Sequence, residues 1–258
     1  MRKADDREAL LMTALERQQK LTVPQAVALL GVSEATVRRL FVQMEQEHKA
    51  IRSYGALQLP LPLAGYSFER LEKMYAEEKQ RIGRAAAQLV ENGDSIYMDS
   101  GTTLLQMAQA LNTRIQSGTL DSVFIVTNSY MNIPILSVGC RVLLLGGEYN
   151  HERRDFSGAV TEQALERFHF KKCFLGCEGI TARMGLSVDH IDLAHVNEMV
   201  LGRSNHKYIL ADHSKFGREA LVSFASLHNI DAILTDALPE ESLDRELRSC
   251  GVSLMAAE

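Results

Sequence analysis

The sequence predicts an α/β protein in which a small N-terminal helical module precedes a larger domain built on a mostly parallel sheet. Residues 21–39 have the pattern of a short helix, a glycine turn and a second helix. After residue 95, seven short apolar segments recur, and helical segments lie between several of them. Strands that alternate with helices over short connections favour a parallel sheet that is covered on both faces.

The composition is that of an ordinary soluble globular protein. The chain has 258 residues, of which 46% are hydrophobic and 24% are charged, and this length suffices for one or two domains. Its N-terminus is polar and partly acidic, and no apolar run reaches the length needed to span a bilayer. We therefore expect neither a signal peptide nor a membrane helix, and a cytoplasmic location.

The charge is distributed unevenly along the chain. The formal net charge is −5, yet residues 1–58 hold nine Lys or Arg against seven Asp or Glu. The remaining residues hold 19 basic against 26 acidic side chains. A weakly basic module beside an acidic domain is compatible with a surface that meets nucleic-acid phosphates while the rest keeps the protein soluble.

Three helices are predicted in the N-terminal module. We expect the first over residues 5–18, the second after an N-cap at Thr22 with Pro24 in its first turn, and a left-handed turn at Gly31. The third begins after an N-cap at Ser33 and runs to about residue 47. The expected inward-facing side chains are Leu10, Leu11, Ala14 and Leu15, then Ala26, Val27, Leu29 and Leu30, then Val37, Leu40, Phe41 and Met44.

A two-stranded wing is expected after the third helix, because residues 50–59 alternate around a glycine. The proline-containing stretch 60–65 breaks all periodicity and marks a boundary. The predicted organisation is a winged helix-turn-helix DNA-binding domain over 1–59, a linker over 60–76 and a second domain over 77–258.

The second domain is predicted to begin with a helical stretch over 67–90 and then to alternate strands with helices. Apolar strands are expected at 96–98, 123–127, 142–145, 173–175, 208–211, 232–234 and 252–254. Helices are expected at 104–111, 161–168, 193–204 and 240–250. Loops at the carboxyl ends of such strands meet at one edge of the sheet, where ligands bind in this architecture.

The third helix carries the candidate contacts to DNA, since the second helix of a helix-turn-helix lies in the major groove. Arg38 and Arg39 can reach phosphates and base edges from there, although two solvated arginines on an amphipathic helix remain the alternative. The full candidate set is Thr22, Ser33, Glu34, Ala35, Thr36, Arg38 and Arg39, with Arg52 and Tyr54 in the wing.

A candidate anion site follows the first strand of the large domain. Residues 99–103 join this strand to a helix through small and hydroxyl-bearing side chains, so that backbone N–H groups can close on an anion. A plain N-cap with a structural aspartate is the alternative. Polar residues also end four later strands, and their convergence predicts a binding cleft. The candidate residues are Asp99, Ser100, Gly101, Thr102, Thr103, Asn128, Gly146, Gly147, Glu178, Asp212 and Lys215.

Neither a metal nor a cofactor is predicted. The four cysteines include Cys173 and Cys177, but no second Cys/His pair lies at zinc-ligand spacing, so we interpret them as small buried hydrophobic side chains. His190 and His195 lie near two aspartates without a second set of ligands. Arg153 and Arg154 in the loop after the third strand either hold an anion or lie on the surface.

With these motifs in view, the chain resembles the DeoR-type transcriptional regulators of bacteria over nearly its full length. The matching segments, in order, are residues 32–39, 78–82, 99–103, 127–128, 146–147, 156–158 and 212–217. Two positions depart from the family pattern. Leu40 follows the paired arginines where an aspartate is usual, and the wing has Tyr54-Gly55-Ala56 in place of a double glycine.

The resemblance implies a winged helix-turn-helix and an effector domain akin to ribose-5-phosphate isomerase. It also implies that a phosphorylated sugar controls the repression of a carbohydrate operon, and that the protein is a homo-oligomer, either a dimer or a tetramer. The expected partners are operator DNA and the sugar phosphate, with no membrane. The two departures concern the operator sequence rather than the fold.

An enzyme is the alternative hypothesis. A phosphosugar isomerase needs a carboxylate base and a cation beside the enediolate, which Asp99, Glu178, Asp212 and Lys215 can supply. A regulator that keeps the ligand site without turnover accounts better for the DNA-binding module. A nicotinamide-dependent oxidoreductase is excluded, because no G-x-G-x-x-G follows the first strand.

Overall fold

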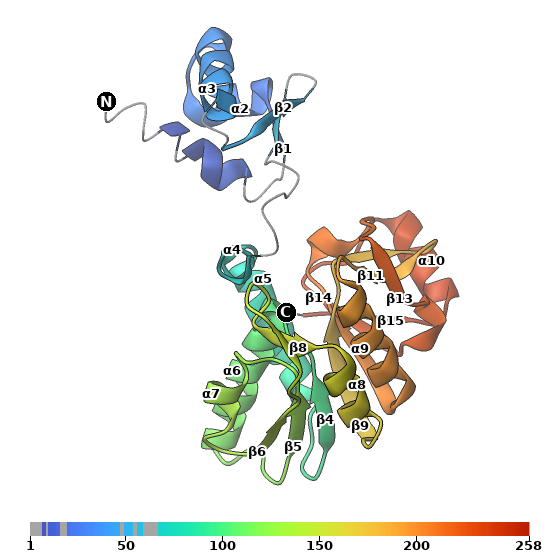
Figure 1. Ribbon diagram of the computed structural model, residues 1–258. Coiled ribbons are helices and arrows are strands. Elements are labelled where there is room, and N and C mark those ends of the chain that lie inside the picture. The colour runs from blue at the N-terminus through green and yellow to red at the C-terminus, as the bar shows by residue number, and fades with distance from the viewer. Residues whose placement is uncertain are drawn as a thin grey trace. The chain divides into compact units, whose positions relative to one another are not determined.

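The computed structural model describes residues 7–8, 10–15, 20–46, 49–53, 56–58 and 67–257 (Figure 1). The chain divides into two compact units, Met1–Arg70 and Leu71–Glu258, each of which is described by itself. Parts of the first predicted helix, the wing tip at Tyr54 and Gly55, and residues 59–66 lie outside the described residues.

The first unit contains β1 (Lys20–Thr22), α2 (Val23–Leu30), α3 (Glu34–Gln46), β2 (Ile51–Ser53) and β3 (Ala56–Gln58). Thr22 caps α2 in a capping box, because the Gln25 N–H donates to Thr22 Oγ1 (3.4 Å) and the Thr22 N–H donates to Gln25 Oε1 (2.8 Å). Gly31 has φ +61°, so it ends α2 in the left-handed conformation that glycine adopts at little cost.

The core of this unit lies between its helices. Leu11 and Leu15 in the first helical stretch are buried, as are Ala26 in α2 and the predicted set Val37, Leu40, Phe41 and Met44 in α3. Two expectations were wrong, because Leu10 is 51% exposed and Leu29 is 44% exposed. Each lies outside the helix face that carries the buried residues of its helix. An apolar residue next to that face fits the same spacing in the sequence but is not buried by it.

The predicted wing is present. Strands β2 and β3 pair antiparallel, with Ile51 opposite Gln58 and Ser53 opposite Ala56. Strand β1, which the sequence did not predict, adds to the other edge of β3 and gives the order β1-β3-β2.

The second unit is built on a seven-stranded sheet of order β15-β14-β12-β9-β4-β5-β6, in which every neighbouring pair is parallel. All seven strands fall where the sequence predicted them. They are β4 (Ser95–Met98), β5 (Phe124–Thr127), β6 (Arg141–Leu144), β9 (Phe170–Gly176), β12 (Ser204–Leu210), β14 (Ala232–Thr235) and β15 (Ser253–Ala256).

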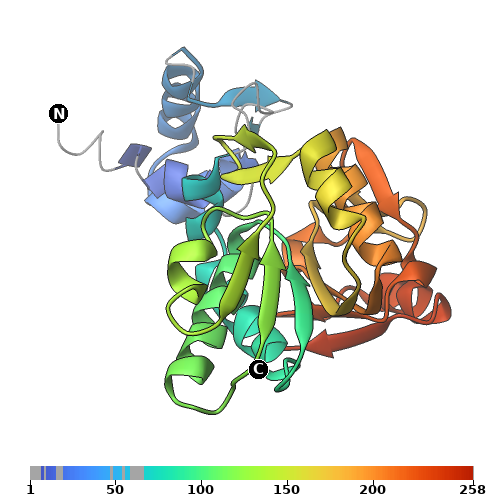
Figure 2. The same cartoon turned by 60° about the horizontal axis from the view of Figure 1, so that its bottom comes forward.

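Helices cover both faces of this sheet (Figures 1 and 2). One face packs against α5 (Ala76–Gln88) and α6 (Thr102–Gln116), and the other against α8 (Ala159–Leu165), α9 (Ile191–Gly202) and α10 (Glu241–Ser249). The contact between α5 and α6 depends on Gly83, because a Cβ atom there would lie 2.6 Å from the backbone of Gln106 and Met107.

The sequence missed the shorter elements. These are α7 (Ile133–Leu136), the hairpin of β7 (Glu148–Asn150) and β8 (Asp155–Ser157), the small antiparallel sheet of β10 (Gly179–Thr181), β11 (Gly185–Val188) and β13 (Val222–Ala225), and the 3-10 turns η1 (His213–Lys215) and η2 (Leu227–Asn229). The predicted helical stretch over 67–90 is present as two helices, α4 (Phe68–Lys73) and α5, which are separated at Tyr75 with φ +52°. No helix in the described part of the chain is long and apolar enough to cross a membrane.

Candidate functional site

The exposed surface of α3 begins at its N-cap. The Thr36 N–H donates to Ser33 Oγ (3.4 Å), and the two side-chain oxygens lie 3.0 Å apart. Ser33, Glu34 and Ala35 are exposed and Thr36 is half-buried, while Val37 beneath them is buried. The first turn of α3 therefore presents the predicted residues outward, and α2, α3 and the turn between them form a helix-turn-helix.

Both arginines of α3 are exposed. Arg38 pairs with Glu34 one turn earlier (2.5 Å), and the Arg39 Nε–H donates to the Ala35 carbonyl (3.4 Å). The side chains of the Arg38–Glu34 pair are 61% and 59% exposed, so the pair contributes little to stability and can give way to a phosphate. Arg52 of β2 pairs with Glu45 of α3 (2.9 Å), which ties the wing to this helix.

Asp99 is the centre of the second candidate site, at the carboxyl end of β4. Its side chain is buried and accepts hydrogen bonds from the backbone N–H groups of Ser100 (2.7 Å) and Gly176 (3.1 Å). Burial raises the pKa of Asp99 to about 7, while the Gly176 N–H and then Arg153 act in the opposite direction. The carboxyl ends of β4 and β9 are thereby joined.

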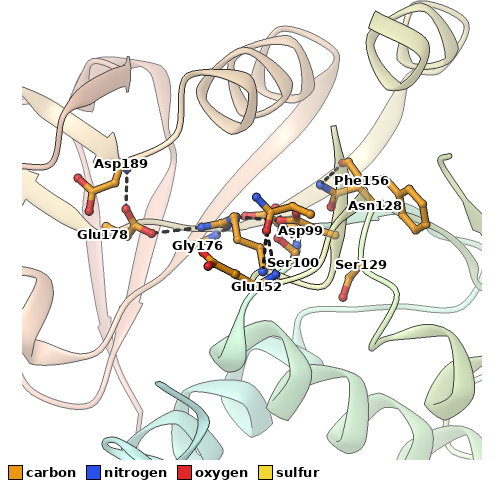
Figure 3. A network of polar contacts seen from close by, with 12 residues as sticks. Asp99, Ser100, Asn128, Ser129, Glu152, Phe156, Gly176, Glu178 and Asp189 are labelled. Atoms are coloured by element: carbon orange, nitrogen blue, oxygen red, sulfur yellow. Dashed lines mark hydrogen bonds and ion pairs between the residues drawn. The ribbon is translucent and has the colours of Figure 1, made fainter. Parts of the chain in front are cut away.

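A chain of polar contacts extends from Asp99 along this edge (Figure 3). Ser100 Oγ donates to Asp155 (2.6 Å), which also accepts from Arg153 Nε (3.0 Å). The other end of the Arg153 guanidinium lies 3.3 Å from Glu178, and Glu178 accepts from the Asp189 N–H (2.6 Å). The Arg153 side chain is 5% exposed, so this buried cation holds two carboxylates in place.

The loop that opens α6 adjoins this chain of contacts. Gly101 has φ +115°, which strongly favours glycine, and Thr102 and Thr103 begin the helix with largely buried side chains. Asn128 at the end of β5 is fully buried. Its Nδ2 donates to the Phe156 carbonyl (3.1 Å), while its Oδ1 has no hydrogen-bond partner among the described residues.

Gly146 and Gly147 follow β6. A Cβ atom on Gly147 would lie 2.2 Å from Thr161 Oγ1 and 2.5 Å from the Ser157 carbonyl, so the chain's own packing explains this glycine. A Cβ atom on Gly146 meets nothing within 4 Å, and the Gly146 carbonyl accepts from Thr161 Oγ1 (2.9 Å).

The end of β12 supplies Asp212 and Lys215. Asp212 is buried and caps η1 by accepting from the Ser214 N–H (3.0 Å). His213 is bonded to Asp236 at the end of β14 through both its backbone N–H and its ring Nδ1, each at 2.7 Å. The ring of Tyr75 meets the His213 ring edge-on at a centroid distance of 4.9 Å.

Lys79 of α5 belongs to the same region, and the sequence prediction omitted it from the site. It is 3% exposed, and its ammonium donates to the Leu71 carbonyl. Burial lowers the pKa of Lys79 to about 8, with Asp212 opposing and Lys215 reinforcing the shift. The available signal was a lysine on the same face of α5 as the buried residues Ile82 and Gly83.

Cys177 connects the two groups of polar residues. It lies just after β9 and is nearly buried, and burial raises the pKa of its thiol to about 12. Four charged residues also act on this thiol electrostatically, namely Lys215, Asp212, Glu178 and Asp99. Because β4, β9 and β12 are adjacent and parallel, the predicted residues Asp99, Glu178 and Asp212 follow neighbouring strand ends at one edge of the sheet. Three residues that bond to the predicted residues or their neighbours were not predicted, namely Asp155, Asn132 and Asp236. Arg153, for which the sequence left open an anion contact or a surface position, is buried in an ion pair with Asp155.

The described residues contain no group of three His, Cys, Asp or Glu side chains that could hold a metal ion. All four cysteines are free. The chemistry of this edge is therefore that of carboxylates, amides, hydroxyls and a few buried cations.

Comparisons with known proteins match both units. Residues 7–61 match the DeoR-like helix-turn-helix domain, and residues 74–237 match the DeoR C terminal sensor domain. The "HTH-type transcriptional repressor GlcR" of Bacillus subtilis is 32% identical, with 98% of this chain and 96% of that protein covered. The "Lactose phosphotransferase system repressor" of Streptococcus mutans is 32% identical (95% and 96% covered), and the "Glycerol-3-phosphate regulon repressor" of Escherichia coli is 27% identical (95% of each).

Similar solved structures are more distant. Ribose 5-phosphate isomerase A of Methanocaldococcus jannaschii covers 55% of each chain at 17% identity with a TM-score of 0.41. The eIF2B beta protein of Chaetomium thermophilum covers 61% of this chain and 50% of its own at 12% identity, also with a TM-score of 0.41. The family assignment rests on the sequence matches, which span both units and nearly the whole chain. This chain belongs to the DeoR family of helix-turn-helix transcriptional regulators.

Proposed function

We propose that this regulator represses a carbohydrate operon in the cytoplasm and that a phosphorylated sugar, bound at the carboxyl edge of the large sheet, controls its affinity for the operator. The observation that carries the proposal is that Asp99, Glu178 and Asp212 follow the carboxyl ends of β4, β9 and β12, which are adjacent parallel strands of the sheet, with Lys215 in the turn after Asp212. The relatives named as repressors of sugar and glycerol 3-phosphate systems support the same class of effector.

This edge of the sheet offers positive charge and backbone donors for the phosphate, and hydrogen-bond acceptors for the sugar. Lys215 and the buried Lys79 supply positive charge for a phosphate, and the N-terminus of α6 at residues 100–103 supplies backbone donors. The carboxylates of Asp99, Glu178 and Asp212, with Oδ1 of Asn128, are acceptors for sugar hydroxyl groups. In this assignment Gly101 and Gly146 let the backbone approach the ligand, and Gly147 serves packing.

The DNA contacts are proposed to come from the start of α3 and from the wing. Arg38 and Arg39 are the main contacts, with Thr22, Ser33, Glu34, Ala35, Thr36 and Arg52 beside them. In a symmetric homo-oligomer, two such helices would read half-sites about one helical turn of DNA apart. We assign the DNA-binding domain to residues 1–59, the linker to 60–76 and the effector domain to 77–258.

Two measurements test the proposal. The protein is titrated onto fluorescent DNA from upstream of its own gene at low salt, with and without each member of a panel of sugar phosphates. Its melting temperature is followed with the same panel, because a ligand that binds the native state raises it. Binding to the DNA and its loss with a stabilising sugar phosphate are expected. Absence of any binding to this DNA, or of any stabilising phosphosugar, would contradict the proposal.

An isomerase is the second candidate, and the pKa of Asp99 near 7 is the observation in its favour, since a base works best near the ambient pH. Against it, both carboxylate oxygens of Asp99 already accept backbone hydrogen bonds. Interconversion of an aldose phosphate and its ketose by the purified protein, lost in Asp99→Asn, would establish the enzyme.

A further inference from the structure

A buried lysine of α5 contacts the segment that leads into the second unit. Leu71, the first residue of that unit, lies within the six-residue helix α4 (Phe68–Lys73). Its carbonyl accepts a hydrogen bond from the ammonium of Lys79, which is 3% exposed. A helix this short is marginal by itself, and a cation near its C-terminal carbonyls stabilises it.

Tyr75, at the joint between α4 and α5, has a strained backbone conformation and contacts a residue close to Lys215. Tyr75 adopts φ +52°, a left-handed conformation that costs energy for any residue with a Cβ atom. Its carbonyl accepts from the Lys79 N–H (2.9 Å), and its ring meets His213, two residues before Lys215. The ring of Tyr75 thus contacts the segment that carries Asp212 and Lys215, and the backbone of Lys79 is bonded to that same tyrosine.

We propose that Lys79 couples effector binding to DNA binding, because the ammonium that holds the Leu71 carbonyl of α4 is also drawn to the phosphate of the effector. This inference rests on the proposed function. In the ligand-free protein Lys79 stabilises the α4–α5 joint. A phosphate beside Lys215 competes with the Leu71 carbonyl for the ammonium and loosens α4, and the operator-binding arrangement loses population.

Lys172 of β9 provides a matched control at the other end of α5. It is another buried lysine, and its ammonium donates to the Leu89 carbonyl (2.7 Å) at the opposite end of α5 and pairs with Asp94 (2.7 Å). It enters from β9 near the start of that strand, whereas the candidate site lies at the carboxyl end. Lys172→Met therefore removes a buried ammonium from a helix carbonyl without touching the α4–α5 joint.

The experiment compares the full-length wild type, Lys79→Met, Lys79→Arg and Lys172→Met. Hydrogen exchange of the amides of residues 68–79 and operator affinity are measured without ligand and with inorganic phosphate. Without ligand, we expect Lys79→Met to exchange faster at 68–76 and to bind the operator at least threefold more weakly, with no further effect of phosphate. Lys172→Met is expected to keep the operator affinity within twofold of the wild type, and Lys79→Arg, which keeps a charged donor, is expected to exchange more slowly at 68–76 than Lys79→Met.

The outcomes separate this inference from the proposed function. If Lys79→Met keeps wild-type exchange at 68–76 and wild-type operator affinity, the coupling role is overturned, even if its response to phosphate is lost. If Lys79→Met does not fold, hydrogen exchange of the wild type alone tests the coupling role. Phosphate must then accelerate exchange at 68–76, and unchanged exchange would overturn the inference. If no phosphosugar stabilises the protein, the proposed function fails, while the ligand-free comparison still judges the contribution of Lys79 to α4.

Discussion

The carboxylate of Asp99 accepts a hydrogen bond from the backbone N–H of Gly176, so the carboxyl ends of two adjacent strands are fastened to each other by a buried acid. A Cβ atom on Gly176 would lie 3.8 Å from Asp99 Oδ2 and 3.4 Å from Leu104, which leaves the acid closely surrounded. Because the charge of Asp99 is buried, its protonation and the stability of the sheet edge are linked.

Asp99 is expected to make the protein less stable as the pH rises from about 4 to about 7. Burial raises the pKa of this acid from 3.8 to about 7, so the native state retains a proton that the unfolded chain has released. The free energy of unfolding therefore falls across this window, by on the order of 4 kcal/mol at about 1.4 kcal/mol per pKa unit.

Urea denaturation at several pH values checks this for the wild type and Asp99→Asn. The variant lacks the titrating group, so its stability should change less between pH 4 and 7 than that of the wild type. Parallel pH dependences of the two proteins would contradict the raised pKa.

Arg38→Ala is expected to weaken operator binding. If Arg38 contacts a phosphate, affinity falls about equally for all sequences and the salt dependence of log K becomes shallower by about one. If it contacts a base, the loss is about 1–3 kcal/mol and specificity relaxes at one position. Fluorescence anisotropy with operator DNA at several salt concentrations distinguishes the two cases, and Arg39→Ala is measured beside it.

Arg245 is the matched control for Arg38. It is an exposed arginine of α10 that pairs with Glu241 one turn earlier (3.2 Å), as Arg38 pairs with Glu34. Arg245→Ala should bind the operator as the wild type does. Unchanged affinity in both Arg38→Ala and Arg39→Ala would show that the recognition surface lies elsewhere.

Lys215→Ala is expected to reduce the response to the effector without weakening operator binding. This side chain supplies a flexible positive charge from η1 toward the proposed phosphate. The checks are the thermal shift and the release of operator DNA as functions of sugar phosphate concentration. A variant that is released at the same concentration as the wild type would remove Lys215 from the site.

Arg153→Met is expected to destabilise the protein by about 3–5 kcal/mol, because it leaves Asp155 and Glu178 without their buried cation. Arg183→Met serves for comparison, since Arg183 is 80% exposed where it pairs with Glu219. That change should have little effect on stability, because solvent screens an exposed ion pair. Chemical denaturation measures both, and equal effects would mean that the Arg153 network is not held as rigidly as the geometry indicates.

The large sheet could be predicted from the sequence because each of its strands is a short apolar run bounded by polar turns. Strands β4, β5 and β14, for example, are almost entirely buried, as expected for a parallel sheet covered on both faces. The helix-turn-helix could also be predicted, because Thr22 and Ser33 cap the starts of its two helices and Gly31 forms the turn between them.

The missing parts depend on contacts between distant segments. Strands β7 and β8 have three residues each and pair through a hairpin that brings Asp155 next to Ser100. Their sequence has no clear alternation, so neither the hairpin nor the buried Arg153–Asp155 pair could be read from periodicity. The break between α4 and α5 at Tyr75 could not be predicted, because no glycine or proline marks it. The ring of Tyr75 contacts His213, which is distant in the sequence and is brought near only by the fold.

Gly83 fixes the distance between α5 and α6, and this distance matters for the proposed effector site as well as for packing. It lies one helical turn after Lys79, and the Gln106 backbone against which it rests lies one turn after Thr102. A single added methyl group at Gly83 must wedge these helices apart. The wedge would separate the lysine that carries the positive charge from the threonines that open the opposing helix. A residue that bears no functional group thus sets the distance between Lys79 and the N-terminus of α6, the two groups that the proposed function assigns to the phosphate.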